Sequence, residues 1–203
     1  MGRELLSAFA QHRALTALLI VLVALLIFVS IKAARAVRAH NAERDKILAK
    51  LKKDAALREK YASVTRDQAQ TADCRELLHG VALNIQQRLE SESDLTAAFR
   101  ALPAHEQYIY AWNYLFCEDA DSLSAFFRLN GSPLTDAALE GARAVFGEQG
   151  FGVLERGFRM FDPDDETTSA LPQDIETLDA DFAAQQDVLL ENIRTFIAAH
   201  TAE

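Results

Sequence analysis

The residues best suited to polar chemistry in this chain are carboxylates, and seven of them fall in two short segments. These are Glu118, Asp119 and Asp121 in the first segment, and Asp162, Asp164, Asp165 and Glu166 in the second. Ca²⁺ and Mg²⁺ prefer oxygen ligands of this kind. The second segment, FDPDDE, lacks the spacing of an EF-hand loop and has no glycine at the turn position. We therefore predict no metal site, and we interpret the segment as an acidic loop between helices.

The same seven carboxylates are our candidate interaction surface for a basic protein. A third acidic group, Glu90, Glu92 and Asp94, follows a segment with helical periodicity. A surface that binds through charge needs its carboxylates to be spread over one face. The alternative is a domain that uses Asp and Glu only for solubility.

Other catalytic chemistry has little support in the residues. The five histidines (His12, His40, His79, His105 and His200) are scattered without ligand spacing. Cys74 and Cys117 form no CxxC motif, and we expect them to be buried free thiols. The chain has no glycine-rich phosphate loop, so we predict no cofactor and no enzyme activity. An enzyme that uses an acidic metal site is the third alternative.

The charge of the chain is divided sharply along its length. Residues 1–66 hold 13 Lys or Arg against 5 Asp or Glu, a net charge of +8. Residues 67–203 hold 8 Arg, no Lys and 25 Asp or Glu, a net charge of −17. A split of this kind indicates a different partner for each half.

An apolar run over residues 14–31 is the element that organises the chain. It contains no charged side chain, and as a helix it would span about 27 Å, close to the thickness of a bilayer core. We predict a single membrane-spanning helix there, after a short head of residues 1–13. A cleaved signal peptide is the alternative, but its apolar region is usually shorter.

The basic segment after the anchor indicates orientation. Lysines and arginines are frequent over residues 32–66, so the positive-inside rule places the following domain in the cytoplasm. We therefore predict a single-pass protein of the inner (cytoplasmic) membrane. The segment has no Pro or Gly and should be a helical stalk that touches anionic lipid near the membrane; a solvated spacer is the alternative.

The acidic domain, residues 67–203, reads as a series of helices. Thr71 and Asp73 are suited to cap the first of them, Ser93 or Asp94 is suited to cap the next, and Gly80 lies inside the first. Residues 106–119, EQYIYAWNYLFCED, are apolar on most sides and should form the central helix. A long helix should run from Pro172 to about His200. We find no segment with strand periodicity, so the predicted fold is all-α: an anchor, a stalk and a compact multi-helix bundle.

Two stretches resemble a known bacterial family. These are YIYAWNYLFCEDADSLSAFFRLNG and LDADFAAQQDVLLENIRTFIAAH, joined by a helix pair punctuated by glycines. They are similar to the helical domain of DNA-mimic-protein-like proteins, and the likeness covers about residues 95–200. The resemblance implies an all-helical domain whose acidic side chains take the place of DNA phosphates toward a DNA-binding regulator.

The family motif is matched in part. It consists of an acidic residue, Asn-Gly-Gly-Phe, then Gln-Phe-Phe and an Asn. Phe126, Phe127 and Asn130 agree with it, whereas Leu123 replaces the first Phe and Ala125 replaces the Gln. The two glycines are replaced by an Asp-Ser pair at residues 121–122. The core aromatics are retained, but the polar and glycine signature is not.

The sequence thus predicts a membrane-anchored acidic module that binds a basic or nucleic-acid-binding protein by charge mimicry. Its predicted partners are membrane lipid, through residues 14–31 and the stalk, and an unidentified basic protein. Direct binding of nucleic acid is not expected for an acidic domain. A structural membrane protein that self-associates into a homo-oligomer is the main alternative.

Overall fold

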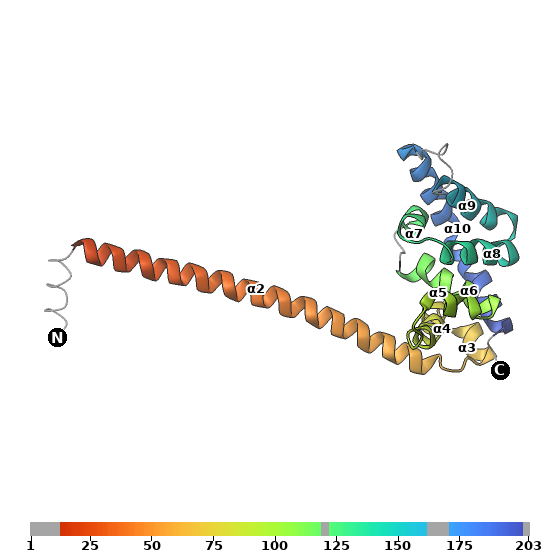
Figure 1. Ribbon diagram of the computed structural model, residues 1–203, viewed down its shortest axis with the longest axis horizontal. Helices are drawn as coiled ribbons and strands as arrows, with labels where there is room; N and C mark the ends of the chain where they lie inside the picture. Colours follow the sequence, from red (N-terminus) through yellow and green to blue (C-terminus); the bar gives the residue numbers. More distant parts are fainter. Residues whose placement is uncertain (1–12, 119–121, 162–170, 201–203) are drawn as a thin grey trace. The chain divides into compact units, whose positions relative to one another are not determined.

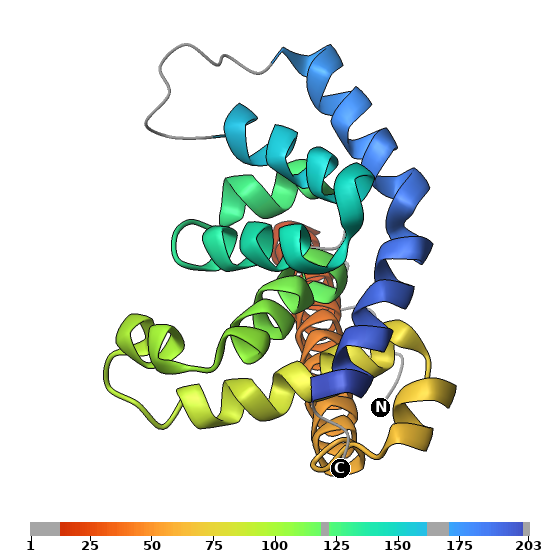
Figure 2. The same cartoon turned by 90° about the vertical axis from the view of Figure 1, so that its right-hand side faces the viewer.

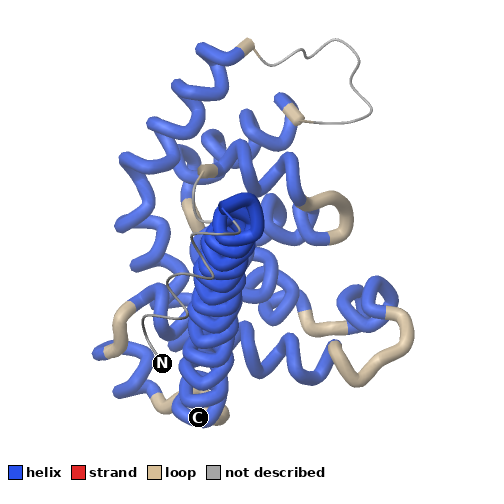
Figure 3. The backbone as a smooth tube through the Cα atoms, turned by 90° about the vertical axis from the view of Figure 1, so that its left-hand side faces the viewer, coloured by secondary structure: helices blue, strands red, loops and turns tan. Residues whose placement is uncertain are grey.

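A computed structural model of the chain describes residues 13–118, 122–161 and 171–200. Within these ranges every regular element is a helix and no strand is present (Figures 1 and 3). The predicted all-α fold is therefore confirmed for this part of the chain. The chain divides into two compact units, residues 1–52 and residues 53–203, and each is described by itself. We call residues 53–203 the body.

Among the described residues, the first regular element is the long helix α2, Arg13–Lys60. It contains no Pro or Gly and is rich in Ala, Leu, Lys and Arg, which are strong helix formers. In the part of the chain that the structure describes, no helix is both long enough and apolar enough to cross a membrane. The anchor predicted over residues 14–31 has most of its side chains outside that description, so it stays a prediction.

The body begins with the last turns of α2 and continues through nine further helical segments among the described residues. These are α3 (Arg66–Thr71), α4 (Cys74–Leu89), α5 (Leu95–Ala101), α6 (Ala104–Asn113), a π-helical turn (Tyr114–Glu118), α7 (Leu123–Leu129), α8 (Leu134–Val145), α9 (Gly147–Met160) and α10 (Pro172–His200). The long helix predicted from Pro172 to His200 is confirmed as α10.

Helix α10 is the spine of the body. It packs against α3 and α4 near its C-terminal end and against α7 and α9 near its start (Figure 2). The apolar side chains that recur along it, Leu178, Phe182, Leu189 and Ile193, are all buried. One long helix therefore connects the N-terminal and C-terminal helices of the body in a single core.

The predicted central helix also lies in this core. Trp112 is fully buried, stacks on the Phe146 ring at 4.9 Å between centroids, and donates a hydrogen bond from Nε1 to the Ala138 carbonyl at 3.3 Å. The helix is not regular throughout, because α6 ends at Asn113 and continues as the π-helical turn. A π turn adds one residue to the helical repeat and so changes the direction of the side chains that follow.

Two of the residues suited to cap helices do so, and α4 is continuous. Asp73 and Asp94 accept hydrogen bonds from the backbone N–H groups of Glu76 and Ala97. Helix α4 is unbroken at Gly80. A Cβ at this position would lie 2.2 Å from Cδ2 of Tyr61, so glycine is needed here for the close approach of the ring.

The body takes part of its core from residues 53–66, which the sequence analysis assigned to the stalk. Leu57, Tyr61 and Val64 are exposed by only 7%, 2% and 5%. The Tyr61 hydroxyl donates to Oε1 of Glu76 at 3.0 Å, and the Asn84 amide donates to the Tyr61 carbonyl at 3.1 Å. The compact unit thus includes the turn that precedes α3.

Candidate functional site

The seven carboxylates predicted as an interaction surface are described only in part. Glu118 is exposed at the end of the π-helical turn. The other six lie outside the described residues: Asp119, Asp121, Asp162, Asp164, Asp165 and Glu166. A shared face for the seven is therefore still a prediction.

Glu118 lies beside a polar link that sequence reasoning missed. Its Oε1 is 3.8 Å from Nδ1 of His79. The same ring nitrogen is 2.9 Å from Oδ1 of Asn113, and Nε2 is 3.4 Å from Oδ1 of Asp54. His79 and Asp54 are only 14% and 13% exposed. The histidine thus joins the end of α2 to α4 and α6, three segments far apart in the sequence.

We interpret this link as structural. Among the described residues, no serine, threonine or cysteine side chain hydrogen-bonds to the His79 ring, which is what a base that activates a nucleophile would require. A buried polar group that keeps its hydrogen bonds holds its neighbours in one arrangement. The lone histidine in α4 gave no signal of this role, because its partners come from distant segments.

The arginines of residues 67–203 are largely engaged within the body. Four of the eight pair with carboxylates: Arg88 with Glu106 (2.7 Å), Arg156 with Asp181 (2.6 Å), Arg159 with Glu155 (2.8 Å) and Arg194 with Glu191 (2.5 Å). Two lie over aromatic rings, Arg128 over Phe161 and Arg143 over Phe151. Arg75 donates to the Phe116 carbonyl and to Oε1 of Gln186.

The body is strongly acidic because its carboxylates outnumber its basic side chains. Residues 53–203 hold 12 Lys or Arg and 27 Asp or Glu, a net charge of −15. Some carboxylates have a local role as N-caps or in the first turns of helices, where the helix dipole favours them. The excess still gives the body a negative electrostatic field.

Neither cysteine is suited to nucleophilic chemistry. Both are free thiols, as expected from the sequence, but they are partly buried rather than fully buried. Burial raises the pKa of Cys117 to about 12, and burial also raises the pKa of Cys74. Because the thiolate is the reactive form, both side chains are held in their unreactive form at neutral pH.

One cleft, of about 420 Å³, lies between α4, α6 and the turn before α3. Its floor includes Val64, Ile85 and Ile109, and the Arg88–Glu106 ion pair lies at its side. Among the described residues Oε2 of Glu106 has no hydrogen-bond partner, although an Arg88 nitrogen lies 2.7 Å from it as the cation of an ion pair. The Arg88 guanidinium compensates the charge of the Glu106 carboxylate, so the acidic group in this cleft already has its counter-ion within the body.

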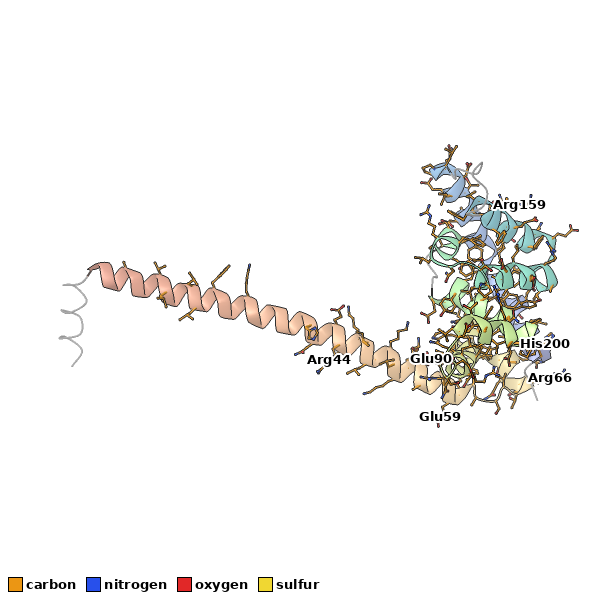
Figure 4. The ribbon with its side chains drawn as sticks, viewed as in Figure 1. Arg44, Glu59, Arg66, Glu90, Arg159 and His200 are labelled. Carbon is orange, nitrogen blue, oxygen red and sulfur yellow. The ribbon has the colours of Figure 1, made fainter. Side chains whose placement is uncertain are left out.

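The second cleft, of about 290 Å³, lies where α4 ends and where α5, α6 and the start of α8 meet. We call it the aromatic cleft. The rings of Phe99, Tyr110 and Tyr114 line it, together with the aliphatic side chains of Leu89, Leu95 and Leu134. Glu90 is also a lining residue and is labelled in Figure 4. In the sequence, the i,i+4 spacing of the two tyrosines places them on one face of a helix, which was the available signal of this cleft. The same spacing is equally typical of a helix face that is buried in the core.

No group of three or more His, Cys, Asp or Glu side chains could hold a metal ion within the described residues. The chain as a whole matches no family model, no curated protein and no solved structure.

Proposed function

We propose that this chain is a membrane-anchored acidic module that binds a basic protein through its carboxylates. The observation that carries the proposal is the charge of the body, −15 over residues 53–203, combined with arginines that are engaged internally. Complementary charge accelerates encounter and is weakened by salt.

The anchor in this proposal is the uncharged run of residues 14–31, whose backbone is helical as part of α2. The basic residues that follow it would lie at anionic lipid, with the body in the cytoplasm next to the inner membrane. The same lipid would repel the acidic body, so the surface that meets a partner would face away from the membrane. A reporter fused to the C-terminus tests the orientation, and activity of a reporter that works only outside the cytoplasm would contradict it.

The partner class in this proposal is a DNA-binding protein, because a surface built for DNA phosphates also accepts carboxylates at phosphate-like positions. The partial resemblance to DNA-mimic-like proteins supports this choice. Binding to the DNA itself is not expected from a body of this charge.

The proposal is tested by capture on the full chain in detergent across a salt gradient. The wild type should retain purified basic proteins at low salt, release them near 1 M salt, and retain no acidic protein. In one variant the seven candidate carboxylates become Asn or Gln. In a matched variant seven others are changed in the same way: Glu140, Glu148, Glu155, Asp174, Glu176, Asp187 and Glu191.

The two variants carry the same net charge, so they separate a defined surface from total charge. We expect the candidate variant to release the bound basic protein at a lower salt concentration than the matched variant does. Release from both variants at the same salt concentration would contradict the assignment of the binding surface to those seven residues. Failure of the wild type to retain any basic protein at low salt would contradict the proposed function.

Self-association is the second candidate function, and one feature of α2 favours it. Ile47, Leu48 and Leu51 lie on neighbouring turns of the helix and are 56%, 45% and 55% exposed. An apolar stripe of this spacing is suited to pair with a second helix. Crosslinking in membranes tests this, and a loss of crosslinked dimer in Leu48→Asp would support it.

A further inference from the structure

The aromatic cleft combines features that suit one kind of group. Three rings from α5, α6 and the π-helical turn meet there: the centroids of Phe99 and Tyr110 are 5.8 Å apart, and those of Tyr110 and Tyr114 are 5.3 Å apart with the rings edge to face. The two tyrosine hydroxyls lie 3.2 Å apart and hydrogen-bond to each other. Each tyrosine hydroxyl thus has the other as a hydrogen-bond partner.

The electrostatic potential of this cleft is negative. The face of an aromatic ring carries negative charge density, which attracts a cation. Glu90 lines the cleft, and its Oε1 accepts a hydrogen bond from the Gln86 amide at 2.8 Å. Burial, the hydrogen bond with Tyr114 and the charges of Glu90 and Glu118 all raise the pKa of Tyr110. Glu90 therefore places a negative charge among the rings that line the cleft.

We propose that the aromatic cleft is a cage for one cationic side chain, an arginine or a lysine, of the basic protein partner. This inference rests on the proposed function and names the contact that gives it specificity. The volume of about 290 Å³ is at the small end for binding sites of whole ligands, and it suits a single side chain. The aliphatic residues of the cleft would hold the methylene stem, and the rings with Glu90 would hold the charged end.

The test uses two labelled peptides and the full chain in detergent. Each peptide has a lysine-rich flank on both sides of a central residue, which is arginine in one and the neutral isostere citrulline in the other. Fluorescence anisotropy gives the ratio of the two affinities. For the wild type we expect the arginine peptide to bind about threefold to tenfold more tightly, the range for a cation at an aromatic face.

Ring variants separate the cage from general attraction. Tyr110→Leu and Tyr114→Leu remove a ring face and should lower the ratio toward the preference that charge attraction alone gives, whereas Tyr110→Phe keeps the face and should keep the ratio. Glu90→Gln should lower the ratio. The matched change Glu148→Gln, on α9, which contributes no lining residue, should leave it unchanged. Circular dichroism verifies the fold of each variant, and if Tyr110→Leu does not fold, Tyr114→Leu and Glu90→Gln decide.

The outcomes separate this inference from the proposed function. If the wild type binds both peptides but the leucine variants keep its ratio, the cage is overturned and the proposed function stands. If the wild type binds neither peptide, the proposed function fails, and tetramethylammonium then tests the cleft alone. A shift of the Tyr110 and Tyr114 ring resonances on its addition supports the cage, and no shift overturns it.

Discussion

The position of Tyr61 predicts where the folded body begins. This ring is 2% exposed, packs against Gly80 and donates its hydroxyl to Glu76 at 3.0 Å. Replacement of a buried aromatic side chain by alanine costs about 3–5 kcal/mol, from lost burial and from the cavity left behind. Total stabilities are about 5–15 kcal/mol, so Tyr61→Ala should remove a large share of the stability of the body.

Urea unfolding of the full chain provides the assay. Trp112 is the only tryptophan and is fully buried in the core of the body, so its fluorescence reports on the body and is insensitive to most of α2. Tyr61→Phe keeps the ring and loses one partly exposed hydrogen bond, so it should cost about 1 kcal/mol. Leu48→Ala changes a 45% exposed side chain of α2 and should alter the free energy of unfolding by less than about 0.5 kcal/mol.

A loss of less than about 1 kcal/mol for Tyr61→Ala would refute this reasoning. It would mean that the turn before α3 contributes little to the core, and that the folded unit starts near residue 67. The expected result instead has a practical consequence. A fragment of residues 67–203 would lack Leu57, Tyr61 and Val64, so binding experiments on a shortened chain should begin at residue 53.

Two further predictions concern the core of the body. In Gly141→Ala the new Cβ would lie 2.6 Å from Cζ2 of Trp112 and 2.8 Å from Cγ of Tyr108, so we expect a loss of about 1–3 kcal/mol in the urea assay. Gly131→Ala meets nothing within 4 Å and should cost less than about 0.5 kcal/mol; equal losses would count against the packing described here. Burial raises the pKa of Cys117 from its ordinary 9.0 to about 12, so the folded state keeps a proton that the unfolded chain loses. Cys117 should therefore lower the free energy of unfolding as the pH rises above 9, by at most about 1.4 kcal/mol per pH unit from this one group, so the fall should be less steep in Cys117→Ala; parallel pH profiles would disagree with this assignment.

Local patterns in the sequence determined the helical elements. Asp73 and Asp94 cap helices as predicted, because a cap depends only on a side chain and the backbone three residues later. The start of α10 at Pro172 follows from the fixed φ angle of proline. The charge division between residues 1–66 and 67–203 is a property of the sequence alone.

The tertiary structure decided which residues of these helices come into contact. Gly80 reads as a weak point in a helix, yet it is the place where the Tyr61 ring packs, and no local pattern pairs residues 19 positions apart. In the same way, His79 contacts Asp54 and Asn113 only because α2, α4 and α6 pack together. The Phe99 ring lies beside the two tyrosines of the aromatic cleft only because α5 packs near α6. Contacts between distant segments depend on how whole helix faces are buried, so the two features closest to a binding site, the polar link and the aromatic cleft, became visible only in the folded chain.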